Sequence, residues 1–319
     1  MPPTEAPPAI TTTALRKSFG NHVVLDGIDL TVAEGTVFAL LGPNGAGKTT
    51  TVRILSTLIG ADSGEVRVAG HDPAREPDAV RAAIGVTGQF SAVDGLLTGE
   101  ENMLLMADLH HLPRREGRDR ARQLLGTFDL LDAAGKPAAS YSGGMRRRLD
   151  LAMCLVGRPR VVFLDEPTTG LDPRSRHAMW QIVRDLVADG VTIFLTTQYL
   201  EEADQLADRI AVLDHGRLVA HGTAAQLKRL VPGGHVSLHF ADSAAYDLAL
   251  RTLAGSTREP DEFTLHVPSD GSVASLRALL DQLDQQSITV ESLSVHSPDL
   301  DDVFLALTGQ PKEARTFPR

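Results

Sequence analysis

Residues 37–49 read VFALLGPNGAGKT. The first five are all apolar, which is typical of a strand buried on both faces of a parallel sheet. The segment from Gly42 to Thr49 fits the pattern G-x-x-x-x-G-K-[ST], and a helix is expected from Lys48 to about Leu58. A glycine-rich turn between a buried strand and a helix binds nucleotide phosphates. Average residue frequencies give this pattern by chance in roughly one chain in a hundred, so the context makes nucleotide binding the better interpretation.

The chemistry of this loop follows from its residue types. Glycines let successive backbone N–H groups curl around a phosphate, and the helix N-terminus adds its dipole. Lys48 is predicted to bridge the β- and γ-phosphates, and Thr49 to offer a hydroxyl to Mg²⁺. The predicted nucleotide-binding residues of the loop are Gly42, Pro43, Asn44, Gly45, Ala46, Gly47, Lys48, Thr49 and Thr50.

A second apolar run, residues 161–164, ends in the two carboxylates Asp165 and Glu166. Ligands of α/β sheets bind at the ends of parallel strands. Asp165 suits holding Mg²⁺ through water, and Glu166 suits polarising the water that attacks the nucleotide. A strand followed by two acids is a weak signal alone, but it becomes strong beside the phosphate loop.

Strand-like and helical stretches alternate along most of the chain, which predicts a parallel sheet covered by helices. The expected strands are two within residues 10–32, then 37–41, 65–70, 84–87, 161–164, 191–195 and 210–213. Residues 98–157 have helical spacing and predict a helical subdomain at the sheet edge. After Pro232-Gly233-Gly234, a small α+β appendage is expected, with strands at 235–240, 263–267 and 288–290 and helices at 244–253, 273–283 and 300–307.

Bulk properties limit the possible classes of protein. The 319 residues carry a net charge of -10, which argues against a nucleic-acid partner. The single cysteine, Cys154, lies in an apolar run and is expected to be a small core residue. No run of ~18 apolar residues predicts a membrane span, so a membrane role requires a partner. The predicted division is a flexible tail at 1–9, a nucleotide-binding domain at 10–231 and an accessory domain at 235–319.

The motifs between these two sites resemble those of ABC ATPases in residue type and in order. Tyr141-Ser142-Gly143-Gly144-Met145 resembles the signature motif, usually Leu-Ser-Gly-Gly-Gln. The resemblance implies that Gln89 is the Q-loop glutamine, which contacts nucleotide and Mg²⁺, that Asp172 belongs to the D-loop, and that Phe19 stacks on adenine. It covers about residues 10–230. It implies the P-loop ABC ATPase fold, with a RecA-like parallel sheet core, an antiparallel β edge and a helical signature subdomain, and it implies ATP as the nucleotide.

The turn at Ser142 adds a physical reason for pairing. A serine and two glycines that open a helix, here Ser142, Gly143 and Gly144, form a second anion site beside any role of Ser142 as a helix cap. One chain cannot easily place both anion sites on the same γ-phosphate, whereas two chains arranged head to tail can. The prediction is a homodimer with ATP sandwiched between opposite copies.

Two positions depart from the family pattern. Met145 replaces the usual glutamine, which is expected to tune contacts without abolishing them. Gln198 stands where most ABC ATPases have a histidine; it is still predicted to be a catalytic residue with Glu166 and Lys48. Glutamine can hydrogen-bond a γ-phosphate or a water, but it cannot carry a positive charge.

Gln198 and the segments TQYLEEAD (197–204) and LDDVFLALTG (300–309) resemble the daunorubicin/doxorubicin resistance branch of exporter ATPases. The resemblance implies export of a hydrophobic drug or antibiotic through a separate membrane permease. It also implies a peripheral location at the cytoplasmic face of the membrane. Candidates for the permease contact are Phe90, Leu96, Leu97 and Met103, although core packing accounts for some of them.

Other functions fit the sequence less well. A soluble ABC ATPase of translation or DNA repair remains the alternative, but such proteins usually carry two cassettes, zinc ligands or long coiled coils. A GTPase needs Asn-Lys-x-Asp, which does not occur. His235, His239 and His266 suggest a metal only weakly, because no cysteine or clustered carboxylate accompanies them in ligand spacing.

Overall fold

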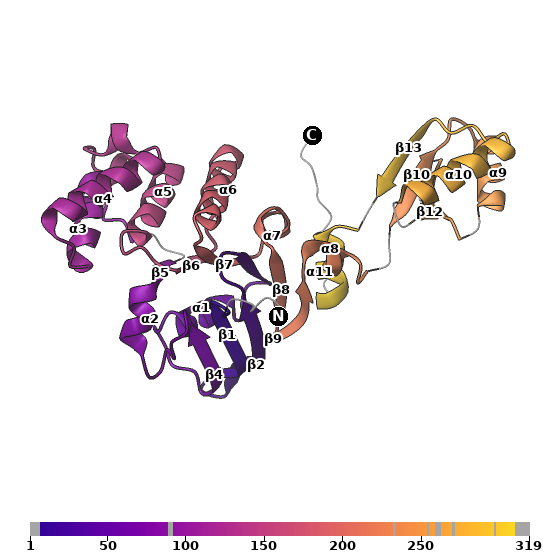
Figure 1. Ribbon diagram of the computed structural model, residues 1–319. Helices are drawn as coiled ribbons and strands as arrows, with labels where there is room; N and C mark the ends of the chain where they lie inside the picture. Colours follow the sequence, from indigo (N-terminus) through magenta and orange to yellow (C-terminus); the bar gives the residue numbers. More distant parts are fainter. Residues whose placement is uncertain are drawn as a thin grey trace, which may run out of the picture. The chain divides into compact units, whose positions relative to one another are not determined.

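The computed structural model describes residues 7–88, 92–231, 234–253, 255–258, 263–269, 272–296 and 298–309 (Figure 1). Contacts along the backbone divide the chain into two compact units, residues 1–224 and 225–319. Among the described residues, no helix is both long and apolar enough to span a bilayer.

The first unit is built on a six-stranded sheet in the order β5-β6-β7-β3-β8-β9. Its strands are β3 (Val37–Leu41), β5 (Ile84–Thr87), β6 (Val161–Asp165), β7 (Thr192–Thr197), β8 (Arg209–Asp214) and β9 (Arg217–Gly222). The first five are parallel, and only β9 runs antiparallel to its neighbour. Every residue of β3, β6 and β7 is buried, because both faces of these strands are covered.

A three-stranded antiparallel sheet, in the order β2-β1-β4, packs beside it. Its strands are β1 (Ile10–Phe19), β2 (His22–Val32) and β4 (Ser63–Val68). Apolar residues of both sheets share one core, in which Phe38 stacks on Phe194 with ring centroids 5.6 Å apart. Ala9 already belongs to this assembly, since its N–H donates to Val32 and its carbonyl accepts from Ala69.

The helices of the first unit form two sets. Three helices lie together beyond β5 in Figure 1 and pack on one another: α3 (Gly99–Leu109), α4 (Arg114–Thr127) and α5 (Gly143–Cys154). Thr98 and Glu101 start α3 with a reciprocal capping box. The others connect the strands and are α1 (Lys48–Leu55), α2 (Pro77–Ala83), α6 (Pro173–Ala188) and α7 (Leu200–Leu206). The predicted α/β fold with an antiparallel edge and a helical subdomain is therefore confirmed.

The second unit is a small α+β domain. Its antiparallel sheet has the order β11-β12-β10-β13, formed by β10 (His235–His239), β11 (Thr257–Arg258), β12 (Thr264–Pro268) and β13 (Ser292–His296). Side chains of α9 (Ser243–Thr252) and α10 (Val273–Gln285) join one face of this sheet in a core around Val236, Leu238 and Leu265. Two further helices are α8 (Ala224–Lys228) and α11 (Leu300–Thr308).

Two predicted boundaries were wrong. The strand expected at residues 288–290 is irregular, and the partner of β10 is β13 at Ser292–His296. Ile288 and Val290 are apolar because they pack into the core as the chain returns from α10, and they belong to no ladder. The helix expected to reach about Leu58 ends at Leu55, since Thr57 takes the left-handed conformation with φ of 65°.

Candidate functional site

The phosphate loop lies between β3 and α1, and its shape depends on two glycines. Gly47 caps α1 with φ of 112°, a conformation that favours glycine, and a Cβ there would lie 2.6 Å from Leu25 Cδ2. A Cβ on Gly42 would collide with the carbonyl oxygen of Leu213. The loop therefore keeps its backbone N–H groups near the N-terminus of α1, where an anion is favoured. Asn44 and Gly45 at its tip are exposed.

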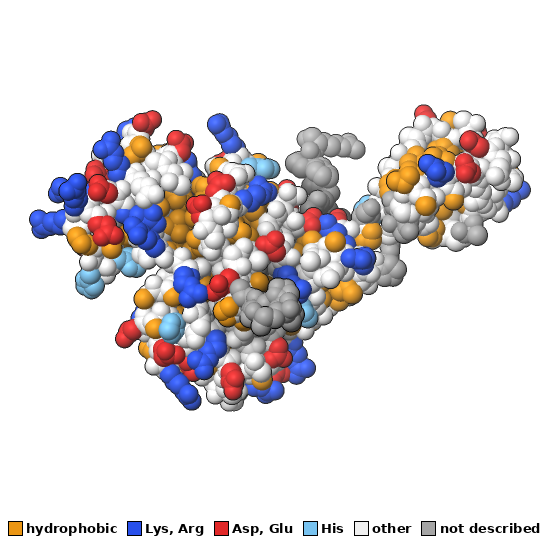
Figure 2. Space-filling model, in the orientation of Figure 1, with side chains coloured by type: hydrophobic (Ala, Val, Ile, Leu, Met, Phe, Trp, Pro, Cys, Tyr) orange, Lys and Arg blue, Asp and Glu red, His pale blue; other side chains and the backbone are white. Residues whose placement is uncertain are grey.

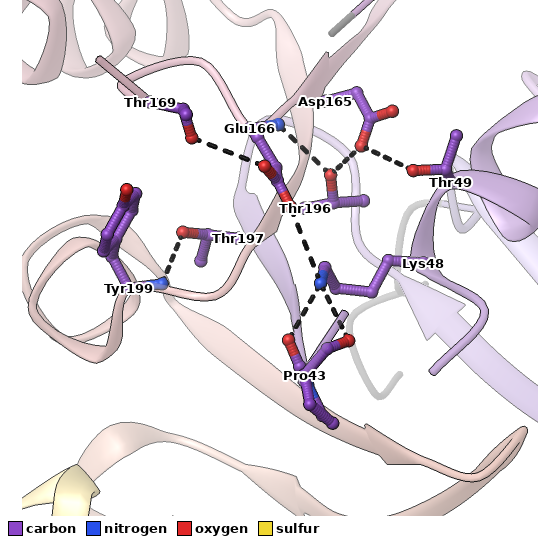
Figure 3. Close-up of polar contacts among 10 residues, drawn as sticks. Pro43, Lys48, Thr49, Asp165, Glu166, Thr169, Thr196, Thr197 and Tyr199 are labelled. Atoms are coloured by element: carbon purple, nitrogen blue, oxygen red, sulfur yellow. Dashed lines mark hydrogen bonds and ion pairs between the residues drawn. The ribbon is translucent and has the colours of Figure 1, made fainter. Parts of the chain in front are cut away.

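Lys48 is held in place by the loop that precedes it. Its Nζ donates to the carbonyl oxygens of Gly42 at 2.8 Å and Pro43 at 3.1 Å, and it lies 3.7 Å from Glu166 Oε1 (Figure 3). The side chain is only 5% exposed. Burial lowers the pKa of Lys48, while the charges of Glu166 and Asp165 oppose this shift. The structure thus aims a largely buried ammonium at the space between the loop and β6.

Asp165 ends β6 beside the start of α1. Its Oδ1 accepts from Thr49 Oγ1 at 3.4 Å and also from the hydroxyl of Thr196 on the adjacent strand β7. Figure 3 shows both hydroxyls pointing at the same carboxylate. A carboxylate and a hydroxyl side by side are hard oxygen donors of the kind that Mg²⁺ prefers. Thr49 and Asp165 therefore fit the predicted metal site.

Glu166 adopts φ of 50°, the left-handed region that glutamate rarely visits. Its N–H donates to the Thr196 carbonyl at 3.0 Å, and its Oε2 accepts from Thr169 Oγ1 at 3.4 Å. Such backbone strain persists where surrounding contacts hold it, which is common at functional sites. The turn directs the carboxylate toward Lys48 rather than along the strand.

Gln198 directly follows β7, and its side chain is half-buried. Thr197 Oγ1 accepts from the Tyr199 N–H at 2.9 Å, a turn that encloses Gln198 and is visible in Figure 3. The Asp165–Glu166 turn and the Gln198 turn follow neighbouring parallel strands at the same sheet edge. The order of strands therefore brings them close, although 32 residues separate Glu166 from Gln198.

Phe19 lies at the end of β1, where the residue is 50% exposed. Lys17 Nζ sits 5.4 Å from the ring centroid and donates to Asp62 Oδ1 at 2.7 Å. Asp62 Oδ2 in turn accepts from the Ser18 N–H at 2.6 Å. The lysine lies over one region of the ring and the carboxylate holds the lysine, while about half of Phe19 stays exposed.

The Ser142 turn belongs to a different part of the first unit. Ser142 Oγ caps α5 by accepting from the Met145 N–H at 3.2 Å, and Ser142 and Gly143 are exposed. Asp172 caps α6 through Ser175, whose hydroxyl lies close to Gly144. In the described part of the chain, no hydrogen bond or ion pair joins Ser142 to the Lys48 loop. Gln89 and Phe90 lie outside the described residues.

Comparison with known proteins identifies this arrangement. The family described as ABC transporter matches residues 25–169. Daunorubicin resistance ATP-binding protein DrrA2 of Streptomyces coeruleorubidus is 50% identical over 96% of both chains. The chain belongs to the ABC transporter ATP-binding proteins. Daunorubicin/doxorubicin resistance ATP-binding protein DrrA of Streptomyces peucetius is 47% identical, over 97% of this chain and 94% of its own.

Solved structures agree with this family. The structure of an ATP-binding subunit of an ABC transporter aligns with a TM-score of 0.63 at 28% identity. It covers 70% of this chain and 92% of its own length. The chain is therefore an ABC ATPase subunit whose cassette carries an additional region.

Three polar residues near the site of this ABC ATPase were not predicted from its sequence. Thr196 bonds to Asp165 and Glu166. Arg147 on α5 donates to the carbonyl oxygens of Gly88, just after β5, and of Asp165, the last residue of β6. Glu202 on α7 is fully buried. The sequence signal for Thr196 was its position as a polar residue directly after a mostly apolar predicted strand. The other two sit in ordinary charged helical segments, and only tertiary packing buries them.

Glu202 leads to a prediction about stability and pH. Burial raises the pKa of the Glu202 carboxyl above 4.5, while the hydrogen bond that Trp180 Nε1 donates to its Oε1 and the charge of Arg176 oppose the rise. Folding thus favours the protonated acid, so wild-type stability falls as pH rises from about 4.5 through the raised pKa. Glu202→Gln, neutral at every pH, is expected to unfold with wild-type free energy near pH 4. At pH 8 it is expected to be more stable by about 1–3 kcal/mol, as measured by urea denaturation.

The control for this prediction is Glu201→Gln, one residue earlier on the same helix. The Glu201 side chain is 63% exposed and pairs with Arg176, so its change is expected to be small at both pH values. Parallel stability curves for wild type and Glu202→Gln across this range would contradict the prediction.

Proposed function

We propose that this ABC ATPase is the motor of an exporter, works as a head-to-tail pair of identical chains, and drives a hydrophobic drug or antibiotic through a separate permease. One observation carries the proposal. Lys48, Thr49, Asp165 and Glu166 converge at one edge of the parallel sheet, beside an exposed loop tip. The Ser142 turn, which is exposed too, heads α5 elsewhere in the same unit.

The residues divide the work at the nucleotide. The loop N–H groups and the Lys48 ammonium bind the β- and γ-phosphates, and the charge of Lys48 offsets the negative charge that develops during transfer. Glu166 orients the attacking water and takes its proton at a carboxylate oxygen. Thr49 and Asp165 would hold Mg²⁺, which neutralises phosphate charge. Gln198 contacts the γ-phosphate or the water, and Phe19 stacks on adenine.

A second copy completes the site. The Ser142-Gly143-Gly144 turn presents a helix N-terminus and a hydroxyl, both suited to an anion. Because this turn and the loop tip at Asn44 are exposed, both are open to a partner. ATP held between the loop of one copy and the turn of the other stabilises the pair, and hydrolysis releases it.

The partnership with a permease rests on the helical region and on the relatives. Three leucines at or before α3 are exposed: Leu96 at 90%, Leu105 at 44% and Leu109 at 64%. Met103 is fully buried and belongs to the core instead. Figure 2 shows Lys and Arg side chains gathered over α3 and α4, where five arginines occur between Arg114 and Arg122. Apolar side chains beside basic ones suit a membrane protein at the anionic cytoplasmic surface.

The test of the exporter is transport with a defined probe. The chain is coexpressed with the membrane protein that copurifies with it, and inside-out vesicles are supplied with doxorubicin and ATP. We expect ATP-dependent accumulation, read as quenching of doxorubicin fluorescence, and none with the Glu166→Gln subunit. A chain that hydrolyses ATP and copurifies with the permease without moving doxorubicin would overturn the drug assignment. A chain that binds no membrane protein would favour the soluble ABC ATPase instead.

A further inference from the structure

Arg147 on α5 makes an unusual number of contacts for a side chain that no motif explains. Its Nε donates to the Pro167 carbonyl at 3.0 Å, and its Nη2 donates to the Asp165 carbonyl at 3.3 Å. Its Nη1 donates to the Gly88 carbonyl at 3.0 Å and to Asp150 Oδ2 at 3.2 Å. The guanidinium thus forms hydrogen bonds with the backbone just beyond β5 and at and after the end of β6.

Asp150, one turn further along α5, completes the arrangement. Its Oδ1 accepts from the Ala92 N–H at 3.0 Å, while Oδ2 pairs with Arg147. The two side chains are only 12% and 3% exposed. A buried ion pair gains from its attraction only when further hydrogen bonds satisfy both partners, and here backbone groups on three sides do so.

This pair links two functional regions of one chain. Arg147 lies five residues after Ser142, in the first turns of the helix that the Ser142 turn opens. The carbonyl groups it holds flank Glu166 directly, at Asp165 and Pro167. Five donors in a rigid fork make arginine suited to fixing several acceptors at once. A displacement of the start of α5 therefore acts on the backbone that orients Glu166.

We propose that Arg147 and Asp150 are positioning residues that couple the two ATP sites of the dimer. The proposal rests on the head-to-tail pairing proposed above, in which Ser142 contacts the partner's nucleotide and Glu166 acts on the chain's own. When ATP fills one site, the Ser142 turn settles on its γ-phosphate, and the Arg147–Asp150 pair transmits that placement to Glu166 of the other site. Occupation of one site then favours the productive geometry at the second, which is positive cooperativity.

The test is the ATP dependence of hydrolysis by the full chain. We expect a Hill coefficient above 1 for the wild type, falling to about 1 in the double variant Arg147→Gln/Asp150→Asn. The double variant removes both charges together, so neither is left buried without its counter-charge. ATP binding by the monomer and the thermal unfolding midpoint are measured alongside, and both are expected to stay close to wild type.

A matched control lies next to Arg147. Arg148 belongs to the same helix but bonds to the Phe128 carbonyl and to Asp129, within the helical group. Arg148→Gln is expected to keep the wild-type Hill coefficient. Both Arg148→Gln and the double variant remove an arginine from α5. A loss of cooperativity in the double variant alone therefore separates coupling between the sites from a general effect on the helix.

The outcomes distinguish this proposal from the one it rests on. A double variant that keeps the wild-type Hill coefficient would overturn the coupling role, as would a wild type that dimerises with ATP but hydrolyses it without cooperativity. A wild-type protein that stays monomeric in ATP would contradict the head-to-tail dimer of the proposed function, and not only the coupling role. A double variant whose Hill coefficient falls only together with monomer ATP binding would also count against coupling.

Discussion

Lys48→Ala is expected to lower ATP hydrolysis by about 10²–10³-fold or more, the effect of removing one preorganised charge from a phosphate site. The Lys48 ammonium is buried and held by the Gly42 and Pro43 carbonyls, so the substitution removes a charge that the loop holds in a fixed place. Its loss also leaves Asp165 and Glu166 facing the phosphates without an opposing charge. Binding of ATP should therefore weaken together with turnover, which calorimetry and phosphate release measure separately.

Lys136→Ala provides the control for this measurement, because Lys136 is exposed and lies outside the site. It is expected to hydrolyse ATP at the wild-type rate. Undiminished hydrolysis by Lys48→Ala would refute the assignment of the phosphate loop, whatever the family resemblance.

Glu166→Gln is expected to trap an ATP-bound dimer while hydrolysis falls by about 10²–10⁴-fold. Glutamine keeps the shape of the side chain and its contact distance to Thr169, but it does not take a proton from water. The nucleotide then stays intact between the two copies, and the mass in saturating Mg-ATP measured by light scattering should double. A protein that remains monomeric under these conditions would count against the dimer mechanism.

The orientation of the trapped dimer can be read by cross-linking in the same background. Asn44→Cys and Ser142→Cys place exposed thiols on the loop tip and on the α5 turn. A short bismaleimide should join a mixture of the two variants and neither variant alone, since a head-to-tail pair sets unlike positions together. The native Cys154 is buried, and burial raises the pKa of its thiol, so it should stay unreactive. Cross-linking of Asn44→Cys alone would indicate a different pairing.

Much of the fold followed from local pattern. Uninterrupted apolar runs identified β3 and all of β6 except its last residue, because strands covered on both faces have no polar side to show. The strand expected at residues 288–290 failed for a related reason. Alternating apolar residues indicate packing against the core, and Ile288 and the partly buried Val290 pack there outside any strand. The spacing of apolar residues therefore predicted which residues pack in the core better than it predicted which residues form hydrogen-bonded strands.

The sequence by itself determined the chemistry of the site. Gly42 to Thr49 and Asp165-Glu166 are contiguous motifs, so their residue types and spacing predict the phosphate loop and the proposed catalytic base Glu166. Only the tertiary structure decided how these motifs are supported: the Thr196 contact to Asp165, the left-handed Glu166, and the Arg147–Asp150 pair. These features join segments distant in sequence, and the burial that gives a charged side chain its importance arises only when the sheet and helices pack.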